Sequence, residues 1–315
     1  MALDVKILIL SDGKTGDLVQ CRGVARSMTG AANIREHVVK PRGFWALPLP
    51  MMPVAPLERR SEIFDEPLPD IVIASGRRTV PHMRVFAAIE RGPFTVILKD
   101  PRQSRGEVDV IWAPVHDGLK GENVFSTLTA PHTISKDTLD TVAPAALIEL
   151  EINGHAAGVI LGGDSGQVKW TADVSARFAD ALRSLPADET PVVVTSRRTP
   201  DVLRDAVEAA LPTAIWPERG GLEQPYLKTL AAADRLIITG DSHNMVSEAL
   251  ATGAAVHVFR PPGLNRKLER FLDALEVQKL VGNMANGFDR GRQEPLDATP
   301  EIAAEFERRY LLKMQ

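Results

Sequence analysis

Polar clusters able to hold a phosphate group or to move a proton stand at intervals along this chain of 315 residues. The first cluster is Asp12-Gly13-Lys14-Thr15-Gly16-Asp17, and Gln20 follows one helical turn later. Two glycines between an apolar run and a helix let the backbone approach a ligand, and a helix N-terminus favours an anion. The spacing matches neither a P-loop nor a G-x-G-x-x-G dinucleotide fingerprint. The segment is therefore either a ligand loop or a plain tight turn.

Adjacent arginines follow two further apolar runs. One run ends in Ser75-Gly76-Arg77-Arg78-Thr79, and another ends in Ser196-Arg197-Arg198-Thr199. Paired arginines directly after a strand are hard to explain as core, and a guanidinium is a planar fork of donors that matches phosphate or carboxylate. Since α/β proteins place ligand contacts in loops at strand ends, we interpret both pairs as anion contacts. The alternative for Arg77 and Arg78 is that one is solvated and the other forms an ion pair between domains.

Two more clusters offer acid–base groups, namely Lys99-Asp100-Pro101-Arg102 and Pro114-Val115-His116-Asp117. Histidine titrates near neutral pH, so His116 beside Asp117 is a candidate acid–base pair. Adjacent residues of a strand point to opposite faces, however, and a lone histidine is more often structural. Arg102 is a further candidate anion contact.

The second half of the chain has its own glycine pair, in Gly162-Gly163-Asp164-Ser165. Backbone amides of such a pair suit a diphosphate. Further on, a helix that begins near Asp241-Ser242 carries Glu248, whose carboxylate can accept hydrogen bonds from two ribose hydroxyls. Apolar neighbours argue against an ordinary surface glutamate there. The candidate nucleotide contacts of this half are Gly162, Gly163, Ser165, Ser196, Arg197, Arg198, Asp241, Ser242, Met245 and Glu248.

Apolar runs that alternate with amphipathic segments must position these clusters. The runs predict strands at 5–10, 34–39, 70–74, 94–98, 108–113, 156–161, 192–195, 214–216, 235–239 and 255–259. Helices are expected between them, the last over about 300–313. Runs without polar alternation suit parallel strands covered on both faces. Every polar cluster then falls at the carboxyl end of a strand, where open parallel sheets bind ligands.

The pattern occurs twice, so we predict an α/β fold of two Rossmann-like domains facing across a cleft. The first domain is placed at 1–140 and the second at 141–298, with a C-terminal helix over 299–315 that packs back on the first. The length of 315 residues suits two domains.

Composition narrows the class of protein. Lys and Arg number 37 and Asp and Glu 41, for a net charge of −4, which argues against nucleic acid as the partner. Cys21 is the one cysteine, so neither an intrachain disulfide nor a cysteine-rich zinc site is expected. No run approaches the roughly 18 apolar residues of a membrane span, and no signal peptide is evident. We expect a cytoplasmic protein that uses no metal and no cofactor.

One apolar segment stands outside the predicted elements. Phe44–Pro53 is rich in proline, which forbids a regular helix, and it is flanked by Arg42 and by Arg59-Arg60. Apolar anchors with basic flanks engage anionic membrane surfaces. The segment is therefore either a peripheral contact with the inner face of the membrane or a loop packed on its own domain.

Taken together, the motifs resemble those of the bacterial and plant family named for a plant mitochondrial fission factor. They are D-G-K-x-G, S-G-R-R-T, D-P-R, P-x-H-D, G-G-x-S, T-S-R-R-T-P and T-G-D-S-x-x-M-x-x-E-A-x-x-T-G, and they run from Asp12 to Gly253. The plant member is described as an outer-membrane-associated recruiter of a dynamin-related protein. The resemblance thus implies one alternative function, a non-catalytic membrane adaptor that recruits a protein partner.

A broader resemblance is to GT-B glycosyltransferases that use UDP-sugars. It implies that the nucleotide-sugar lies on the C-terminal half with Glu248 at the ribose, and that Asp12–Gly16 corresponds to the N-terminal glycine loop. The catalytic histidine often found in that loop is absent, and Asp17 sits near its position. The leading hypothesis is a metal-independent glycosyltransferase with an envelope or lipid-linked acceptor. The acceptor would face Asp12 or Asp17, together with Arg77, Arg78, His116 and Asp117. An NAD enzyme is disfavoured because the dinucleotide fingerprint is missing.

Overall fold

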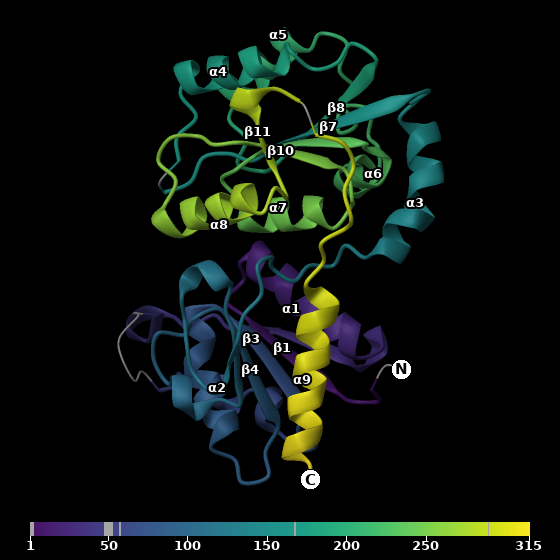
Figure 1. The fold of residues 1–315 in the computed structure, drawn as a ribbon. Coiled ribbons are helices and arrows are strands. Elements are labelled where there is room, and N and C mark those ends of the chain that lie inside the picture. Colours follow the sequence, from purple (N-terminus) through teal and green to yellow (C-terminus); the bar gives the residue numbers. More distant parts are fainter. Residues whose placement is uncertain (1–2, 47–52, 57, 167, 289) are drawn as a thin grey trace. The chain divides into compact units, whose positions relative to one another are not determined.

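The computed structural model describes residues 3–46, 53–56, 58–166, 168–288 and 290–315. The chain divides into two compact units (Figure 1). Unit 1 comprises Met1–Thr133 and Ala298–Gln315, and unit 2 comprises Ile134–Asp297. Each unit is an α/β body with its own sheet and its own apolar core.

The sheet of unit 1 is entirely parallel and has the strand order β2-β1-β3-β4-β5-β6. Its strands are β1 (Ile7–Ser11), β2 (Ile34–Val38), β3 (Ile71–Ser75), β4 (Phe94–Leu98), β5 (Val110–Trp112) and β6 (Val124–Phe125). Every residue of β1, β3 and β4 is buried, as expected for apolar runs in a sheet covered on both faces. The chain reverses its direction of winding between β1 and β3, which makes their carboxyl ends the switch point of this sheet.

Helices cover both faces of this sheet. The described helices are α1 (Thr15–Met28), α2 (Val80–Ala87) and α9 (Thr299–Lys313). Although α9 is the last helix of the chain, it lies beside α1, and its Ile302, Ala303 and Phe306 are buried in the core beneath β1 and β3 (Figure 1). On the other face, α2 contributes Met83 and Phe86. The end of the chain is thus a structural part of the unit that the beginning forms.

The sheet of unit 2 is also parallel and has the order β11-β10-β9-β7-β8. Its strands are β7 (His155–Leu161), β8 (Glu189–Thr195), β9 (Arg235–Thr239), β10 (Ala255–Phe259) and β11 (Gly282–Asn283). Its helices are α3 (Lys136–Glu149), α4 (Ala172–Leu182), α5 (Asp201–Ala210), α6 (Pro225–Ala232), α7 (His243–Leu250) and α8 (Arg266–Val277). The switch point of this sheet lies between β7 and β9.

The predicted α/β fold with two parallel sheets is confirmed, and the predicted cleft stays a prediction. The strand predicted at 214–216 is wrong in length, because the structure has a single bridge there, between Ile215 and Val192. Pro212 and Pro217 bracket this segment, and proline lacks the N–H that a longer ladder needs. Among the described residues, no helix has both the length and the apolar character that crossing a bilayer requires.

Strand register brings the polar clusters to a common edge in each unit. In unit 1, Ser11 is level with Ser75, which is level with Leu98. In unit 2, Leu161 is level with Thr195. The loops that follow these residues carry the predicted clusters, so the carboxyl edge of each sheet collects them.

Candidate functional site

Asp12 lies at the switch point of unit 1, between the ends of β1 and β3. Its side chain is buried, and its Oδ2 accepts a hydrogen bond of 3.0 Å from Lys14 Nζ. Gly76, at the end of β3, has a φ of +98°, and a Cβ there would come within 2.5 Å of Asp12 Cγ. A glycine is therefore required at 76, both for the backbone conformation and for the space that Asp12 occupies. Asp12 in turn holds the exposed Lys14 at this edge.

Asp17, in the first turn of α1, is also buried and is held by two lysines. Lys99 Nζ donates to its Oδ1, and Lys14 Nζ lies 4.0 Å from its Oδ2. Lys99 follows β4 with a φ of +74°, a left-handed conformation that is strained for a residue with a side chain. Nothing local in the sequence indicates that the side chain of Lys99 reaches Asp17 on α1. Asp12 and Asp17, two of the predicted acceptor-side carboxylates, are thus ion-paired with lysines.

His116 and Asp117 lie on a 3₁₀ turn over Val115–Asp117, after β5. Because this segment is a turn rather than a strand, the two side chains lie on the same side. His116 Nε2 is 3.9 Å from Asp117 Oδ1, and both side chains are mostly buried. The structure therefore brings together the pair that strand geometry would have separated.

The arginine loop of unit 1 combines a structural frame with exposed charges. Ser75 Oγ donates to Leu98 O at 3.3 Å, and Thr79 Oγ1 donates to Gly76 O at 2.7 Å, so both hydroxyls serve the fold. Arg77 and Arg78 are exposed, and their guanidinium groups have no ion-pair partner in the part of the chain that the structure describes. These two side chains are available to a ligand.

The remaining predicted residues of unit 1 lie around this edge. Arg102, with a φ of +65°, is exposed, and its N–H donates to Asp100 Oδ1 at 2.8 Å. Gly13 N–H donates to Ser11 Oγ at 3.0 Å, while Gln20 is fully buried within α1. Gly16 lies in the first turn of α1. Gln20 thus faces the interior of the unit rather than solvent.

In unit 2, Asp241 occupies the switch point between β7 and β9. Gly163 N–H donates to its Oδ2 at 3.1 Å, and Gly162 N–H donates to Thr239 Oγ1 at 2.7 Å. A Cβ on Gly162 would come within 2.1 Å of Asp241 Oδ1. Burial raises the pKa of the Asp241 carboxyl above its ordinary value. Both glycine amides, predicted as diphosphate donors, here donate to the protein itself.

The second arginine loop, at the end of β8, is tied to this switch point. Thr199 Oγ1 donates to Gly162 O at 2.6 Å, and Ser196 Oγ donates to the same carbonyl at 3.0 Å. Arg198 Nη1 donates to Asp164 O at 3.0 Å, and its Nη2 lies 3.5 Å from Asp241 Oδ2. Arg197 is exposed beside it. Arg198 is therefore oriented by Asp241.

Glu248 is buried on α7 and is paired with a tyrosine of the preceding helix, α6. Ser242 Oγ begins the helix by accepting from Met245 N–H at 3.4 Å. Two turns later, Glu248 Oε2 accepts a hydrogen bond of 2.6 Å from Tyr226 Oη, on α6. Burial raises the pKa of Glu248 to about 7, and it also raises the pKa of Tyr226. No local signal in the sequence linked these two residues.

Ser165 has a structural role in the loop after β7. Its Oγ accepts a hydrogen bond from Val168 N–H at 3.0 Å, and its own N–H donates to Val168 O at 3.0 Å. The loop therefore closes on itself through Ser165.

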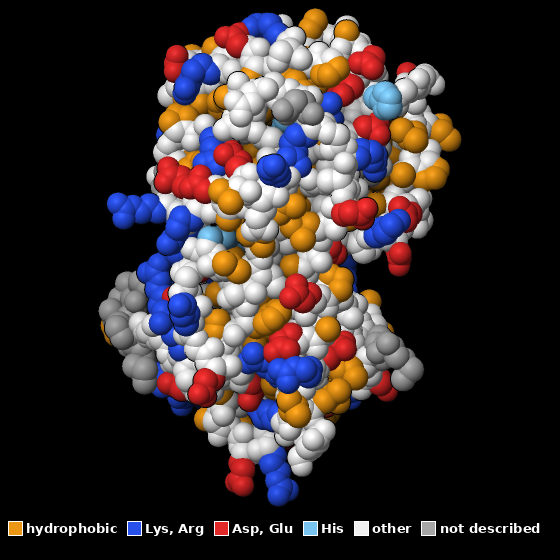
Figure 2. All heavy atoms as spheres, in the orientation of Figure 1, with side chains coloured by type: hydrophobic (Ala, Val, Ile, Leu, Met, Phe, Trp, Pro, Cys, Tyr) orange, Lys and Arg blue, Asp and Glu red, His pale blue; other side chains and the backbone are white. Residues whose placement is uncertain are grey.

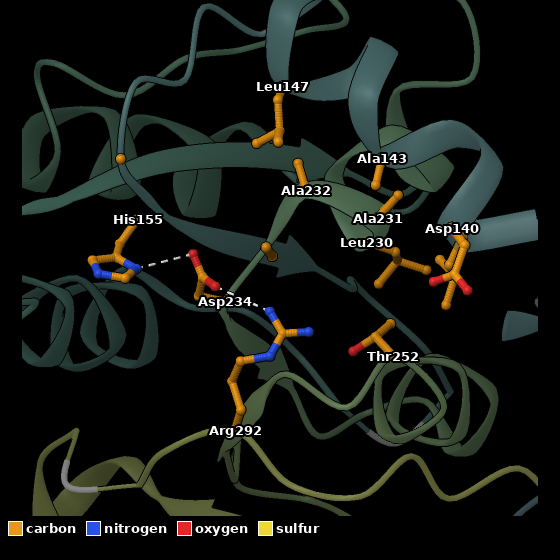
Figure 3. A pocket seen from close by; sticks show the side chains of 13 residues that line it. Asp140, Ala143, Leu147, His155, Leu230, Ala231, Ala232, Asp234, Thr252 and Arg292 are labelled. Atoms are coloured by element: carbon orange, nitrogen blue, oxygen red, sulfur yellow. Dashed lines mark hydrogen bonds and ion pairs between the residues drawn. The ribbon is translucent and has the colours of Figure 1, made fainter.

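A hollow of about 550 Å³ opens at the opposite, amino end of the unit 2 sheet (Figure 3). α3 and α6 supply its apolar wall, and Asp234, Arg292 and His155 stand together on one side. Asp234 accepts from Arg292 at 3.0 Å and lies 3.3 Å from His155 Nδ1. Burial alone would raise the pKa of Asp234, but these contacts and the Ala156 N–H together lower it. None of the predicted site residues lines this hollow.

Two α/β units, each with a parallel sheet and a polar switch point, define a protein of the GT-B glycosyltransferase-like fold. The chain is similar to the UDP-GlcNAc 2-epimerase of Methanocaldococcus jannaschii, with a TM-score of 0.56 and 12% identity, over 98% of this chain and 99% of that one. It is also similar to a UDP-glucosyltransferase from Polygonum tinctorium, with a TM-score of 0.55 and 12% identity, over 100% and 93%. At these identities the likeness shows the fold.

The family model described as "Mitochondrial fission ELM1" matches residues 15–310, and the chain belongs to that family. An uncharacterized protein of Rickettsia prowazekii is 25% identical over 324 residues, covering 88% of this chain and 90% of that protein. The mitochondrial fission protein ELM1 of Arabidopsis thaliana is 25% identical over 288 residues, covering 80% of this chain and 66% of the plant protein. The family resemblance predicted from the motifs is confirmed.

Proposed function

We propose that this protein binds a nucleotide-sugar, with a UDP-sugar favoured, on unit 2 and transfers the sugar to an acceptor without a metal ion. The observation that supports this most strongly is the buried Glu248, which lies on the helix after the switch strand β9 and is held by Tyr226. A buried carboxylate is costly unless it has partners, so its place at a ligand-binding edge favours a function.

Glu248 is the proposed ribose contact. Tyr226 donates to Oε2, which leaves the other oxygen and further lone pairs for the two ribose hydroxyls. The ionised carboxylate has no O–H of its own and accepts more strongly from both hydroxyls than the protonated group does. Since its pKa is about 7, nucleotide binding should strengthen as the pH rises through neutrality, with release of a proton.

Arg197 and Arg198 are the proposed diphosphate contacts. When the bond from the anomeric carbon to the donor phosphate breaks, charge develops on the leaving nucleoside diphosphate, and guanidinium groups stabilise it. Arg198 is already oriented by Asp241, so it needs little reorganisation. In the proposed mechanism, these two guanidinium groups stabilise the diphosphate charge in place of a metal ion.

The acceptor hydroxyl needs a base on unit 1, and Asp17 or Asp12 is proposed for this role. The acceptor oxygen forms the new bond to the anomeric carbon while its proton passes to the carboxylate. Lys14 and Lys99 hold these carboxylates in ion pairs, and Asp17 must exchange one of these contacts for the hydroxyl. His116 with Asp117 is the second candidate pair at this edge.

A ligand panel tests the proposal. UDP-, GDP- and ADP-sugars are compared by thermal shift and calorimetry on the wild type, Glu248→Ala and Tyr226→Phe. At least one nucleotide-sugar should stabilise the wild type, Glu248→Ala should bind it at least tenfold more weakly, and Tyr226→Phe should shift the pH dependence of binding. The absence of any stabilisation, or unchanged binding in Glu248→Ala, would refute it.

The alternative is a membrane-associated adaptor that recruits a protein partner, which membership of the mitochondrial fission family favours. Phe44 supports the membrane contact, because it is 61% exposed and its ring lies 5.8 Å from that of Trp45. Much of Phe44–Pro53 lies outside the described residues. An adaptor on the cytoplasmic face should sediment with anionic vesicles, lose that binding in Phe44→Ser, and show no response to nucleotide-sugars.

A further inference from the structure

The two switch points share one arrangement, a buried carboxylate that orients an exposed cation. In unit 2 the carboxylate of Asp241 is fully buried, and Arg198, 47% exposed, lies 3.5 Å away. In unit 1 the side chain of Asp12 is 6% exposed, and Lys14, 68% exposed, lies 3.0 Å away. In both units a glycine of the neighbouring strand end makes the room for the carboxylate. Each unit therefore presents a cation whose position is set in advance.

The carboxyl edge of the unit 1 sheet, which carries Lys14, has more positive than negative side chains. At the level ends of β1, β3 and β4, cations outnumber carboxylates. The cations are Lys14, Arg77, Arg78, Lys99, Arg102 and Arg105, and the carboxylates are Asp12, Asp17 and Asp100. Figure 2 shows Lys and Arg side chains gathered on one flank of this unit. This edge is positive within a chain whose net charge is −4.

Ion pairing divides the arginines at and near this edge into two groups. Arg84 donates to Glu107 at 2.9 Å, and Arg105 donates to Asp100 at 2.8 Å. Within the described ranges, the guanidinium groups of Arg77, Arg78 and Arg102 have no such carboxylate. Three guanidiniums without a carboxylate partner, on loops that follow level strand ends, and an oriented lysine on the first of these loops together match a group with several anionic oxygens. A phosphate ester fits this charge better than a single carboxylate.

We infer that unit 1 carries an anion site of its own, formed by Lys14, Arg77, Arg78 and Arg102, and that it takes the phosphate group of a second ligand. Where the proposed function holds, this ligand is the acceptor, which is then a phosphorylated compound. The anion site itself does not depend on the nucleotide site of unit 2. A phosphate anchored at this edge would hold the acceptor beside Asp12 and Asp17.

The test follows glycine amides by NMR in the ¹⁵N-labelled full-length chain. Titration with inorganic pyrophosphate should shift Gly13, Gly16 and Gly76 in unit 1. Arg77→Gln/Arg78→Gln should weaken this response at least tenfold, while the response of Gly162 and Gly163 stays as in the wild type. Arg26→Gln/Arg91→Gln removes the same charge from exposed arginines away from this edge and should change neither response. Shifts confined to unit 2, or an unchanged unit 1 response in the first variant, would overturn the inference.

A second arm identifies the source of the phosphate. Short-chain phosphatidic acid below its micellar concentration is titrated under the same conditions. Binding at unit 1 at least tenfold tighter than pyrophosphate indicates a lipid-linked acceptor, and equal or weaker binding indicates a soluble one. If unit 1 responds to pyrophosphate but unit 2 ignores every nucleotide-sugar, the anion site stands and the proposed function fails.

Discussion

Tyr226 Oη donates a hydrogen bond of 2.6 Å to Glu248 Oε2, joining two helices that lie on either side of β9 in the chain. Burial holds the pKa of Glu248 at about 7, against an ordinary value of 4.5. The protonation state of a carboxyl group with a pKa near neutrality changes with ligand binding, with pH and with the loss of its hydrogen-bond partner. It therefore offers the most direct experimental access to unit 2.

Stability should fall as pH rises across the range set by Glu248. Its folded pKa is raised from 4.5 to about 7, so between these values the folded state binds more protons than the unfolded state, and stability decreases. Glu248→Gln removes this dependence. It should raise the free energy of unfolding at pH 8 by something on the order of 3 kcal/mol and change it little at pH 4.5.

Urea unfolding at both pH values measures this effect. The matched control is Glu301→Gln, at an exposed residue in the first turn of α9, which should show no such difference. Equal effects of Glu248→Gln at the two pH values would mean that folding does not raise the pKa of Glu248.

Glycines at the two switch points should not tolerate a side chain. Gly76→Ala combines a strained φ with a collision against Asp12, and Gly162→Ala collides with Asp241. Each should cost roughly 2–4 kcal/mol of unfolding free energy, or force its carboxylate out of place. Gly154→Ala, where nothing lies within 4 Å of the added Cβ, is the control. Thermal unfolding compares the three variants. An unchanged Tm in both Gly76→Ala and Gly162→Ala would contradict the packing described.

The backbone conformation of Lys99 and the charge of its side chain should make separable contributions to stability. Lys99→Met keeps the left-handed φ of +74° and loses the ion pair with Asp17. Lys99→Gly loses the ion pair as well but relieves the backbone, so it should be more stable than Lys99→Met by about 1 kcal/mol. Denaturant midpoints of the two variants measure the difference. A less stable glycine variant would show that the aliphatic stem of Lys99 matters more than the strain.

Helix α9 should be needed for the stability of unit 1 and not for the stability of unit 2. Phe306 is fully buried in the core of unit 1, so Phe306→Ala should cost about 3–5 kcal/mol. Leu312→Ala, at a residue that is 55% exposed, should change stability by less than about 0.5 kcal/mol. Hydrogen exchange, read separately in β1 and in β7, reports on each unit. Equal loss of protection in both strands after Phe306→Ala would argue against independent cores.

Sequence patterns were sufficient for the fold class and for the position of the polar clusters. The fully buried β1, β3 and β4 match the prediction, because short uninterrupted apolar runs are typical of parallel strands covered on both faces. The burial of Glu248 was also anticipated from its apolar neighbours on α7. The single bridge at Ile215 differs from the strand predicted at 214–216, because pattern alone does not show whether a short apolar run pairs over several residues.

The contacts that give the clusters their chemistry were beyond the sequence. Tyr226 is 22 positions from Glu248, and Lys99 is 82 positions from Asp17. The glycine amides at 162 and 163 were expected to face a ligand, yet they donate to Thr239 and Asp241, which come from another strand end. Such pairings depend on strand order, which no local pattern encodes.

By itself, the sequence determined that this is an α/β protein of two parallel sheets with charged loops after its strands, and that it resembles the mitochondrial fission family. Periodicity is local, so it reports where an element runs and where it ends. Only the tertiary structure decided that Asp12 meets Gly76 and that Asp241 orients Arg198. The reason is physical: strand order and a few left-handed residues bring distant side chains together, and burial then determines which charges must pair and which remain for a ligand.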